Sequence, residues 1–479
     1  MDKKIHDVSI QLAAVLETQK TAQLQDGSPS LEVRSDRLSR AIDIILTNKT
    51  KLQDAMIADF GHRSRDLTNF ADIASSIKAL RHARKHMRSW MRASRRHLEF
   101  PLGLIGASGT VKYQPKGVVG LISPWNFPIN LTFAPLAGIL AAGNRAMIKP
   151  SEFTPATSAL LAELIDQTFN DEELFVITGE ADVAATFASL PFDHLLFTGS
   201  TVVGKKVMMV ASENLVPVTL ELGGKSPVII GESADISKAA TSIMHGKSFN
   251  AGQICVCPDY VLLKEDRKGD FIEAARAAVG KMFPSGIKDN DDYTSVRGRW
   301  HFDRLKKYIE DARIKGADIV ELNAKNEDFS QQPNHKIPPT LIMGVSDDMT
   351  VMQEEIFGPL LAVRYSNDIE DAVDYVNSHP RPLALYFFGN SPKEENFVID
   401  NTTSGGVTVN DTIMHVGQEN LPLGGIGPSG MGHYSGKDGF VEFSHKKAIY
   451  RQTPFDVLKF LRPPYAAMFR KYVNFNLKN

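Results

Sequence analysis

The feature that most constrains the fold is an alternation of strand-like and helix-like segments that starts near residue 110. Strand candidates rich in aliphatic residues include GVVGLISPW, NRAMIKP, ELFVITG, HLLFTGS and PVTLELGG. Between them lie segments with helical spacing of apolar residues, such as TPATSALLAELIDQTF, ADVAATFASL and VVGKKVMMVAS. Strand–helix repetition of this kind favours a parallel sheet covered by helices. A second alternating region spans 225–415, so the predicted fold class is α/β.

The first 97 residues are predicted to be helical instead. Apolar residues recur at helical spacing from Leu38 to Met56. Ser35 or Asp36 is placed to cap the start of this helix, and Gly61 is placed to end it. Because 479 residues exceed what one hydrophobic core supports, we expect two or three domains.

A second helix is predicted over 67–96, and its C-terminal half is basic. Arginines and lysines recur every three or four residues from Arg81 to Arg96, which places most of them on one face. A solvated face explains this pattern, and association with an anionic partner or membrane surface is the alternative.

Composition excludes several classes of function. The formal net charge of −2 gives no overall attraction to nucleic acid. No window approaches 18 uninterrupted apolar residues, and the N-terminal segment lacks the apolar core of a signal peptide, so no stable membrane anchor is expected. With only two cysteines the chain has no disulfide framework, which indicates a reducing compartment and predicts a cytoplasmic protein.

One candidate for phosphate binding is FTGSTVVG, residues 197–204. A strand-like run leads into a turn of small residues and then a helix, so free backbone N–H groups and the positive helix end would face an anion. Gly199 permits close approach, and the Ser200 hydroxyl can donate. A plain strand–turn–helix corner has the same appearance. The formal G-x-G-x-x-G match at 425–430 follows no clear strand and contains Pro428, so we interpret it as a loop.

Both cysteines lie in one short segment, as Cys255 and Cys257. A metal site needs three or four ligands, and only His245 and Asp259 lie nearby, so no metal site is predicted. A disulfide between positions two apart would form a small strained ring. Small buried packing residues or a nucleophile remain as alternatives.

Six further motifs occur in a fixed order and resemble one family. They are SPWNFP at 123–128, IKPSE at 148–152, FTGS at 197–200, LELGGKSP at 220–227, GQIC at 252–255 and EEIFGPLL at 354–361. In order and spacing they resemble the NAD(P)-dependent aldehyde dehydrogenase superfamily over about 110–450. The surroundings of the cysteines and the segment after 408 resemble its short, dimeric branch, and within it coniferyl aldehyde dehydrogenases.

The resemblance implies three catalytic residues. Cys255 would be the nucleophile, which adds to the aldehyde carbonyl so that a hydride can leave and a thioester remains. Asn126 would steady the oxyanion together with the Cys255 backbone N–H. Glu221 would act as the base that forms the thiolate or activates water. Cys257 lies outside the motif and is interpreted as a packing residue.

The resemblance also implies a dinucleotide site. Lys149 and Glu152 would contact the adenosine ribose, and an acid there suits NAD, with NADP as the alternative cofactor. Gly199 and Ser200 would lie at the pyrophosphate. Three more residues would contact the cofactor near its nicotinamide end: Trp125, Glu355 and Phe357.

The implied architecture has three parts. A Rossmann-like cofactor domain would combine 1–95 with 120–221, and an α/β catalytic domain would cover 222–415. A β-strand oligomerisation arm would use 96–119 and 416–479, which predicts a homodimer. The substrate would be an aromatic aldehyde such as coniferyl aldehyde, or a medium or long aliphatic one. The alternatives are acyl transfer to coenzyme A, and a non-catalytic binding protein that keeps the fold.

Overall fold

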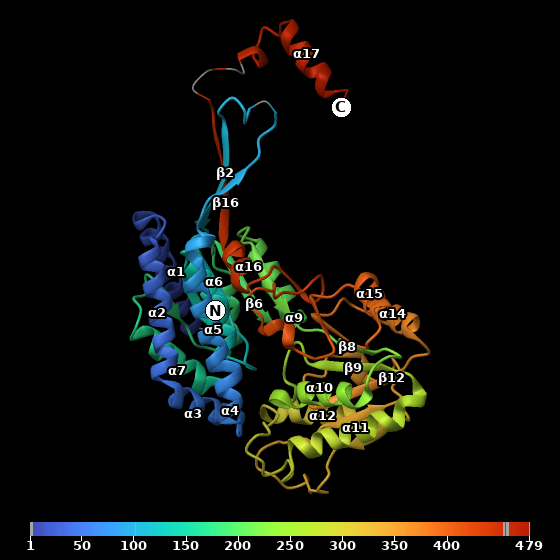
Figure 1. Cartoon of the computed structure of the whole chain (residues 1–479). Coiled ribbons are helices and arrows are strands. Elements are labelled where there is room, and N and C mark those ends of the chain that lie inside the picture. Colours follow the sequence, from blue (N-terminus) through green and yellow to red (C-terminus); the bar gives the residue numbers. More distant parts are fainter. Residues whose placement is uncertain (1–2, 101, 454–455, 457–458, 479) are drawn as a thin grey trace.

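The computed structural model describes residues 3–100, 102–453, 456 and 459–478. Two α/β bodies lie side by side, and a narrow arm built from strands leaves one of them (Figure 1). The N-terminal helices and the segment up to α9 form the first body, and the segment from β8 to α15 forms most of the second (Figure 1). Each body contains its own sheet, as the predicted α/β class requires.

The first body is built on a six-stranded sheet with the order β15-β7-β6-β3-β4-β5. All neighbouring strands are parallel except β15, which pairs antiparallel with β7. Their bounds are β3 Val118–Ile122, β4 Arg145–Lys149, β5 Leu174–Val176, β6 His194–Gly199, β7 Val218–Leu222 and β15 Gly430–Met431.

Helices cover both faces of this sheet, because successive strand residues point to opposite sides. In β3, Val118 belongs to a core with Leu12 and Leu16 of α1, whereas Val119 faces the core that α2, α5 and α6 share. The helices of this body are α1 Lys3–Asp26, α2 Leu31–Thr47, α3 Lys49–Phe60, α4 Arg65–Leu67, the π-helix η1 Thr68–Ala74, α5 Ser75–Trp90, α6 Asn130–Ala142, α7 Pro155–Asp166, α8 Ala181–Ala188 and α9 Thr201–Ser212.

The second body is built on a seven-stranded sheet with the order β10-β11-β12-β9-β8-β13-β14, in which only β10 runs antiparallel to its neighbour. The strands are β8 Ser226–Ile230, β9 Pro258–Leu263, β10 Asp318–Glu321, β11 Thr340–Met343, β12 Leu360–Tyr365, β13 Ala384–Phe388 and β14 Gly406–Val409. Again the two faces alternate: Val228 packs toward α10 and α11, and Ile229 packs toward α12, α14 and α15.

The main helices of the second body are α10 Ile236–Ser248, α11 Lys268–Met282, α12 Gly298–Ile314, α13 Thr350–Gln353, α14 Ile369–Asn377 and α15 Pro392–Asn401. Short 3₁₀ turns are η2 Phe249–Gly252, η3 Glu265–Arg267, η4 Met414–Gly417 and η5 Lys459–Leu461. In α10, α14 and α15 a side chain caps the first turn, through Asp235, Asp368 and Ser391 respectively.

The arm is a three-stranded antiparallel sheet of β1 Ser94–Arg96, β2 Ser108–Pro115 and β16 Ser444–Arg451, in the order β1-β2-β16. Eight residue pairs join β2 to β16, so two segments far apart in sequence leave the body together. The arm lies beyond α16 Gly436–Glu442, and α17 Ala467–Asn476 lies at its far end (Figure 1). In the described part of the chain, β16 pairs along one edge only.

Two of the predicted N-terminal helices differ from the observed ones. The first helix does not start at Ser35 or Asp36, because Ser30 caps it by accepting a hydrogen bond from the Val33 N–H at 3.4 Å. The predicted helix is also divided in two, because Asn48 ends α2 and precedes α3, and Gly61 with φ of 79° ends only the second of them. Two charged residues of this segment, Arg34 and Arg37, are buried in the folded chain.

The predicted basic helix over 67–96 is also wrong at its C-terminal end. The helical segment ends at Trp90, and Arg95 and Arg96 belong to β1, where they pair with Thr110 and Gly109. Hydrogen bonds to β2 pair the backbone N–H and C=O groups of this strand. Arg95 and Arg96 therefore belong to the sheet and not to the basic face of the helix. A helix long and apolar enough to cross a membrane does not occur among the residues that the structure describes.

Candidate active site

The carboxyl ends of four parallel strands bring together most of the residues predicted to be functional. Asn126 follows β3, Lys149 ends β4, Ser200 follows β6, and Glu221 lies near the end of β7. Sheet order changes direction here, since β4 lies on one side of β3 and β6 on the other. In open parallel sheets, ligands bind beyond the carboxyl ends of the strands at such a switch point.

Cys255 reaches the same region from the second body. It lies between η2 and β9, after a turn in which Asn250 and Ala251 have φ of 51° and Gly252 has φ of 71°. A Cβ atom on Gly252 would lie 2.2 Å from the Gly358 carbonyl oxygen, so only glycine permits this close approach. The turn fixes the direction in which the cysteine side chain leaves the backbone.

Cys255 and Glu221 face each other. The distance from the Cys255 Sγ to the Glu221 Oε1 is 3.7 Å, and the thiol donates. Burial raises the pKa of Cys255 well above its usual value, and the nearby carboxylates of Glu221 and Glu355 raise it further. Burial also raises the pKa of Glu221. A thiol beside a carboxyl group of raised pKa is the pairing that proton transfer between them requires.

Asn126 is buried near the cysteine segment. Its side-chain amide donates to the Gln253 carbonyl oxygen at 3.2 Å, and Gln253 lies two residues before Cys255. The amide nitrogen carries two hydrogens, so the second remains available for a substrate oxygen. The predicted trio of Cys255, Glu221 and Asn126 is therefore brought to one place.

The predicted ribose contacts lie at the end of β4. Lys149 is almost fully buried, and its ammonium group donates to the Pro150 carbonyl oxygen at 2.9 Å and to Glu152 at 3.2 Å. A buried ammonium group that is held by one carboxylate has a further hydrogen for a ribose hydroxyl. Both residue types suit the hydroxyl groups of a dinucleotide.

The strand–turn–helix corner predicted at 197–204 is present, with β6 ending at Gly199 and α9 starting at Thr201. Ser200 caps α9, and its side chain accepts a hydrogen bond from the Val203 N–H. This first turn points a helix N-terminus at the carboxyl edge of the sheet, as a pyrophosphate site needs. Val202 and Val203 are exposed beside it.

The three remaining predicted residues gather at the junction of the two bodies. The rings of Trp125 and Phe357 pack edge to face with centroids 5.4 Å apart. Glu355 lies against the glycine pair after β7, where a Cβ atom on Gly223 would lie 2.0 Å from its Oε2. Burial raises the pKa of Glu355 to about 8, and Asp259 contributes to that shift. The residue types at this edge, a buried lysine, carboxylates, a helix N-terminus and aromatic rings, are those that a dinucleotide would need.

A sequence comparison identifies the family to which this site belongs. The model of the aldehyde dehydrogenase family matches residues 9–449. The chain belongs to the aldehyde dehydrogenase family. This finding confirms the resemblance that the six motifs indicated.

Curated relatives match this aldehyde dehydrogenase along nearly its whole length. A probable coniferyl aldehyde dehydrogenase of Caulobacter vibrioides is 56% identical over 468 residues, which cover 97% of this chain and 96% of the relative. A coniferyl aldehyde dehydrogenase of Pseudomonas sp. strain HR199 is 51% identical over 444 residues, covering 93% and 91%. The predicted resemblance to coniferyl aldehyde dehydrogenases is therefore confirmed.

Solved structures agree with the fold. The substrate-bound AldH of Staphylococcus aureus superposes with a TM-score of 0.91 at 35% identity and covers 97% of this chain and 99% of its own. An indole-3-acetaldehyde dehydrogenase in complex with NAD⁺ gives 0.82 at 25% identity, covering 93% and 89%. The predicted α/β class and the nicotinamide cofactor are confirmed.

Sequence reasoning missed two residues of this aldehyde dehydrogenase's site. Tyr434 is buried beside Glu221, and burial together with that carboxylate raises its pKa well above the usual value. Arg63 lies behind Asn126 and donates to its carbonyl oxygen at 2.8 Å. No local pattern marks either residue, because each meets the site only through long-range folding.

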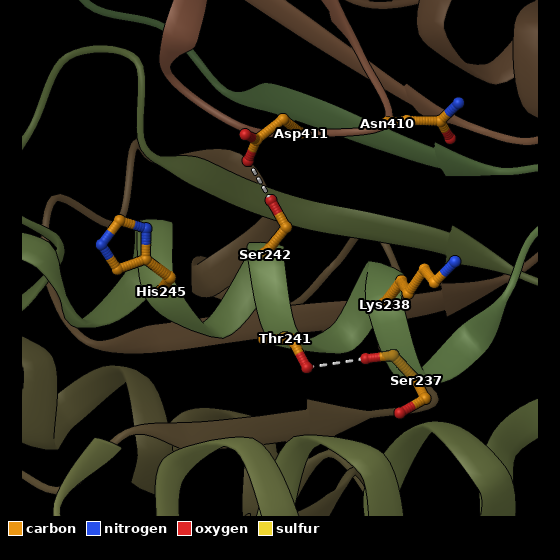
Figure 2. A pocket seen from close by; sticks show the side chains of 7 residues that line it. All are labelled: Ser237, Lys238, Thr241, Ser242, His245, Asn410 and Asp411. Carbon is orange, nitrogen blue, oxygen red and sulfur yellow. Dashed lines mark hydrogen bonds between the residues drawn. The ribbon is translucent and has the colours of Figure 1, made fainter. Parts of the chain in front are cut away.

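Two surface pockets of the described residues lie away from this site. One of about 380 Å³ lies over α10 and the loop after β14, where Ser242 donates to Asp411 (Figure 2). Residues of polar type line it, and it contains none of the predicted site residues. The other, of about 450 Å³, follows the basic face of α5 from Ala74 to Lys85.

The raised pKa of Glu355 predicts a pH-dependent stability. A carboxyl whose pKa rises from 4.5 to about 8 on folding stabilises the folded state fully below pH 4.5, and this contribution is lost as the pH rises toward 8. Glu355→Gln removes the charge, so we expect an apparent melting temperature about 2–4 °C higher than wild type at pH 8.5. Differential scanning fluorimetry without cofactor measures it.

At pH 4 the same variant should melt close to the wild type, because the Glu355 carboxyl is then neutral in the folded state and mostly neutral in the unfolded state. Glu310→Gln serves as the matched control, since Glu310 is exposed on α12. An equal difference for Glu355→Gln at both pH values would show that the Glu355 carboxyl does not titrate in this window.

Proposed function

We propose that this aldehyde dehydrogenase oxidises aromatic aldehydes of the coniferyl aldehyde type to free carboxylic acids, with Cys255 as the nucleophile. The proposal is carried by the 3.7 Å contact between the Cys255 thiol and the Glu221 carboxyl, with the Asn126 amide beside the same loop. Relatives named coniferyl aldehyde dehydrogenases at 56% and 51% identity support the substrate class.

Each residue has a distinct step. Glu221 takes the proton from Cys255, and the resulting thiolate adds to the aldehyde carbon. Asn126 and the Cys255 N–H donate to the alkoxide that forms. Bound NAD supplies the acceptor for the hydride that leaves this carbon. Glu221 releases this first proton to solvent. It then takes a proton from the water that cleaves the thioester and returns it to the departing thiolate, which releases the acid and restores the thiol.

The cofactor position follows the same residues. Lys149 and Glu152 would hold the adenosine ribose, and Gly199 and Ser200 would face the pyrophosphate at the start of α9. Glu355, Phe357 and Trp125 would contact the nicotinamide half. The corresponding proposal for domains keeps 1–95 with 120–221 for the cofactor and 222–415 for catalysis, with 96–119 and 416–479 as the arm.

Aromatic side chains near Cys255 support an aromatic substrate. Phe249 packs against both Phe127 and Phe70 with ring centroids 6.2 Å apart in each pair. Phe249 and Cys255 are both partly exposed at the edge of the same hydrophobic core. An aryl ring held there would gain edge-to-face or stacked contacts that an alkyl chain lacks.

The catalytic assignment predicts different kinetic effects for substitutions at Cys255 and at Glu221. Cys255→Ser should abolish NADH formation, because a hydroxyl of ordinary pKa adds poorly to the carbonyl. Glu221→Gln should lower steady-state turnover about 10²-fold or more, because thioester hydrolysis loses its base. Stopped-flow measurement of NADH with coniferyl aldehyde reports both steps.

Cys257→Ala is the matched control and should keep wild-type turnover, because Cys257 is buried away from Glu221. Turnover of Cys255→Ser at the wild-type rate would contradict the assignment. A requirement for coenzyme A, with an acyl thioester as product, would favour the acyl-transfer alternative instead of hydrolysis.

The aromatic contacts predict a selective effect of Phe249→Ala. Loss of one ring contact should lower kcat/KM for coniferyl aldehyde about 2- to 10-fold more than for an aliphatic aldehyde of similar length. Steady-state kinetics with both substrates measures this ratio. An equal loss for the two would place the aryl ring elsewhere.

We also propose a cytoplasmic homodimer. The free edge of β16 on a projecting arm supports pairing with a second copy, because such an edge exposes unpaired backbone groups. The two free cysteines support a reducing compartment. Light scattering should give twice the chain mass of 52.8 kDa, and a monomer mass at micromolar concentration would contradict the dimer.

A further inference from the structure

A fully buried ion pair lies directly behind the proposed site. Arg63 follows α3, and its guanidinium donates to Asp72 of the π-helix η1 at 2.7 Å. Neither side chain has any exposed surface. The guanidinium is stacked between aromatic rings, with Phe60 at 4.6 Å and Phe127 at 5.0 Å from its central carbon. Its position is therefore fixed on several sides.

A second nitrogen of this guanidinium contacts the two segments that carry the proposed oxyanion donors. Its Nη1 donates to the Asn126 carbonyl oxygen at 2.8 Å and to the Asn250 Oδ1 at 2.9 Å. Asn126 belongs to the loop after β3, and Asn250 belongs to the turn before Cys255. One side chain thus ties the two α/β bodies together where the alkoxide would form.

The Asp72 carboxylate fixes the other end of the Asn126 loop. Its Oδ1 accepts a hydrogen bond from the Asn130 N–H at 3.3 Å, and α6 begins at Asn130. The residue before this helix gives it no side-chain cap. A carboxylate at a helix N-terminus is favoured both by the free N–H groups and by the helix dipole. Asp72 therefore sets where the helix after Asn126 starts.

On the cysteine side, hydrogen bonds close a ring. The Asn250 side chain donates to the carbonyl oxygens of Asn126 and Gln253, both at 3.2 Å. The Asn126 amide donates to the same Gln253 oxygen. Asn250 has φ of 51°, a strained conformation for a residue with a side chain, and these bonds hold it there.

We propose that the Arg63–Asp72 pair is a positioning device for the oxyanion site, which sets the Asn126 amide relative to the Cys255 backbone N–H. The inference rests on the proposed function, because it assumes that these two donors receive the alkoxide. A buried ion pair is weak evidence for stability alone, since desolvation offsets the attraction. The planar guanidinium presents one nitrogen to the Asp72 carboxylate and another to the two carbonyl-type acceptors, a spacing that the single ammonium nitrogen of a lysine does not reproduce.

The inference predicts that Arg63→Lys and Arg63→Met slow the chemical step. Misplacement of catalytic groups by about 1 Å costs on the order of 10²-fold in rate. We expect a loss of about 10²-fold in the rate constant of the NADH burst with coniferyl aldehyde. Hydrolysis of p-nitrophenyl acetate without cofactor should fall in parallel, because it needs the same donors and no hydride transfer. The NAD dissociation constant should stay within about twofold.

Two features of the design separate positioning from folding. A merely structural loss leaves fewer folded molecules, so it lowers the burst amplitude and the number of thiols labelled by iodoacetamide without changing the burst rate constant. The control is Arg37→Met, which removes a buried arginine from an ion pair at 2.9 Å with the partly exposed Glu173, within the first body. It should keep the wild-type burst rate constant even where its melting temperature falls.

The outcomes are distinct. A wild-type burst rate constant in Arg63→Lys overturns the inference, as does a loss confined to burst amplitude. Should Arg63→Met fail to fold, Arg63→Lys decides, because it keeps the buried charge. Failure of the proposed function would give a different result. The wild-type enzyme would then form no NADH from aldehydes, or the Cys255→Ser variant would form it as fast as the wild type.

Discussion

The structure depends on the register of parallel strands in the first body. Because β3, β4, β6 and β7 run in one direction, the residues that follow them all emerge at a single edge of the sheet. The β6–β7 pairing sets Thr198 opposite Glu221, and the β3–β6 pairing sets Ile122 opposite Phe197. A shift of one residue in either pairing would turn the adjoining side chains to the opposite face.

The electrostatics of this edge disfavour ionisation of the Cys255 thiol in the free enzyme. Glu221 and Glu355 both lie close enough to raise the pKa of the Cys255 thiol, and burial raises the pKa of all three groups. Adding a negative charge to such a cluster is unfavourable. The oxidised nicotinamide ring is positively charged, so its arrival would favour the thiolate, and by linkage the thiolate would favour its binding. Reactivity is then coupled to the presence of the oxidant.

A structural feature could be predicted from the sequence where the residues that determine it are adjacent in the chain. The corner from β6 to α9 was predictable, because an apolar run, a glycine and a capping serine are adjacent in sequence. The start of α2 at Leu31 was not, because Arg34 and Arg37 look like surface residues and become buried only through distant partners, the Ala141 carbonyl oxygen and Glu173. Arg63 was missed for the same reason. Its role depends on three segments that meet only in the folded chain.

The two cysteines show how a difference of two positions separates chemistry from packing. Cys255 is partly exposed and points its sulfur at Glu221, which can take the proton. Cys257 is buried, its thiol contacts the backbone oxygens of Gly246 at 3.7 Å and Pro258 at 3.5 Å, and the Lys247 side chain lies beside it. A carbonyl oxygen accepts a hydrogen bond but cannot take up a proton at neutral pH, and an ammonium group has no lone pair to take one up. The carboxyl partner therefore distinguishes Cys255 from Cys257, and the turn at Gly252 and the start of β9 determine which sulfur meets it.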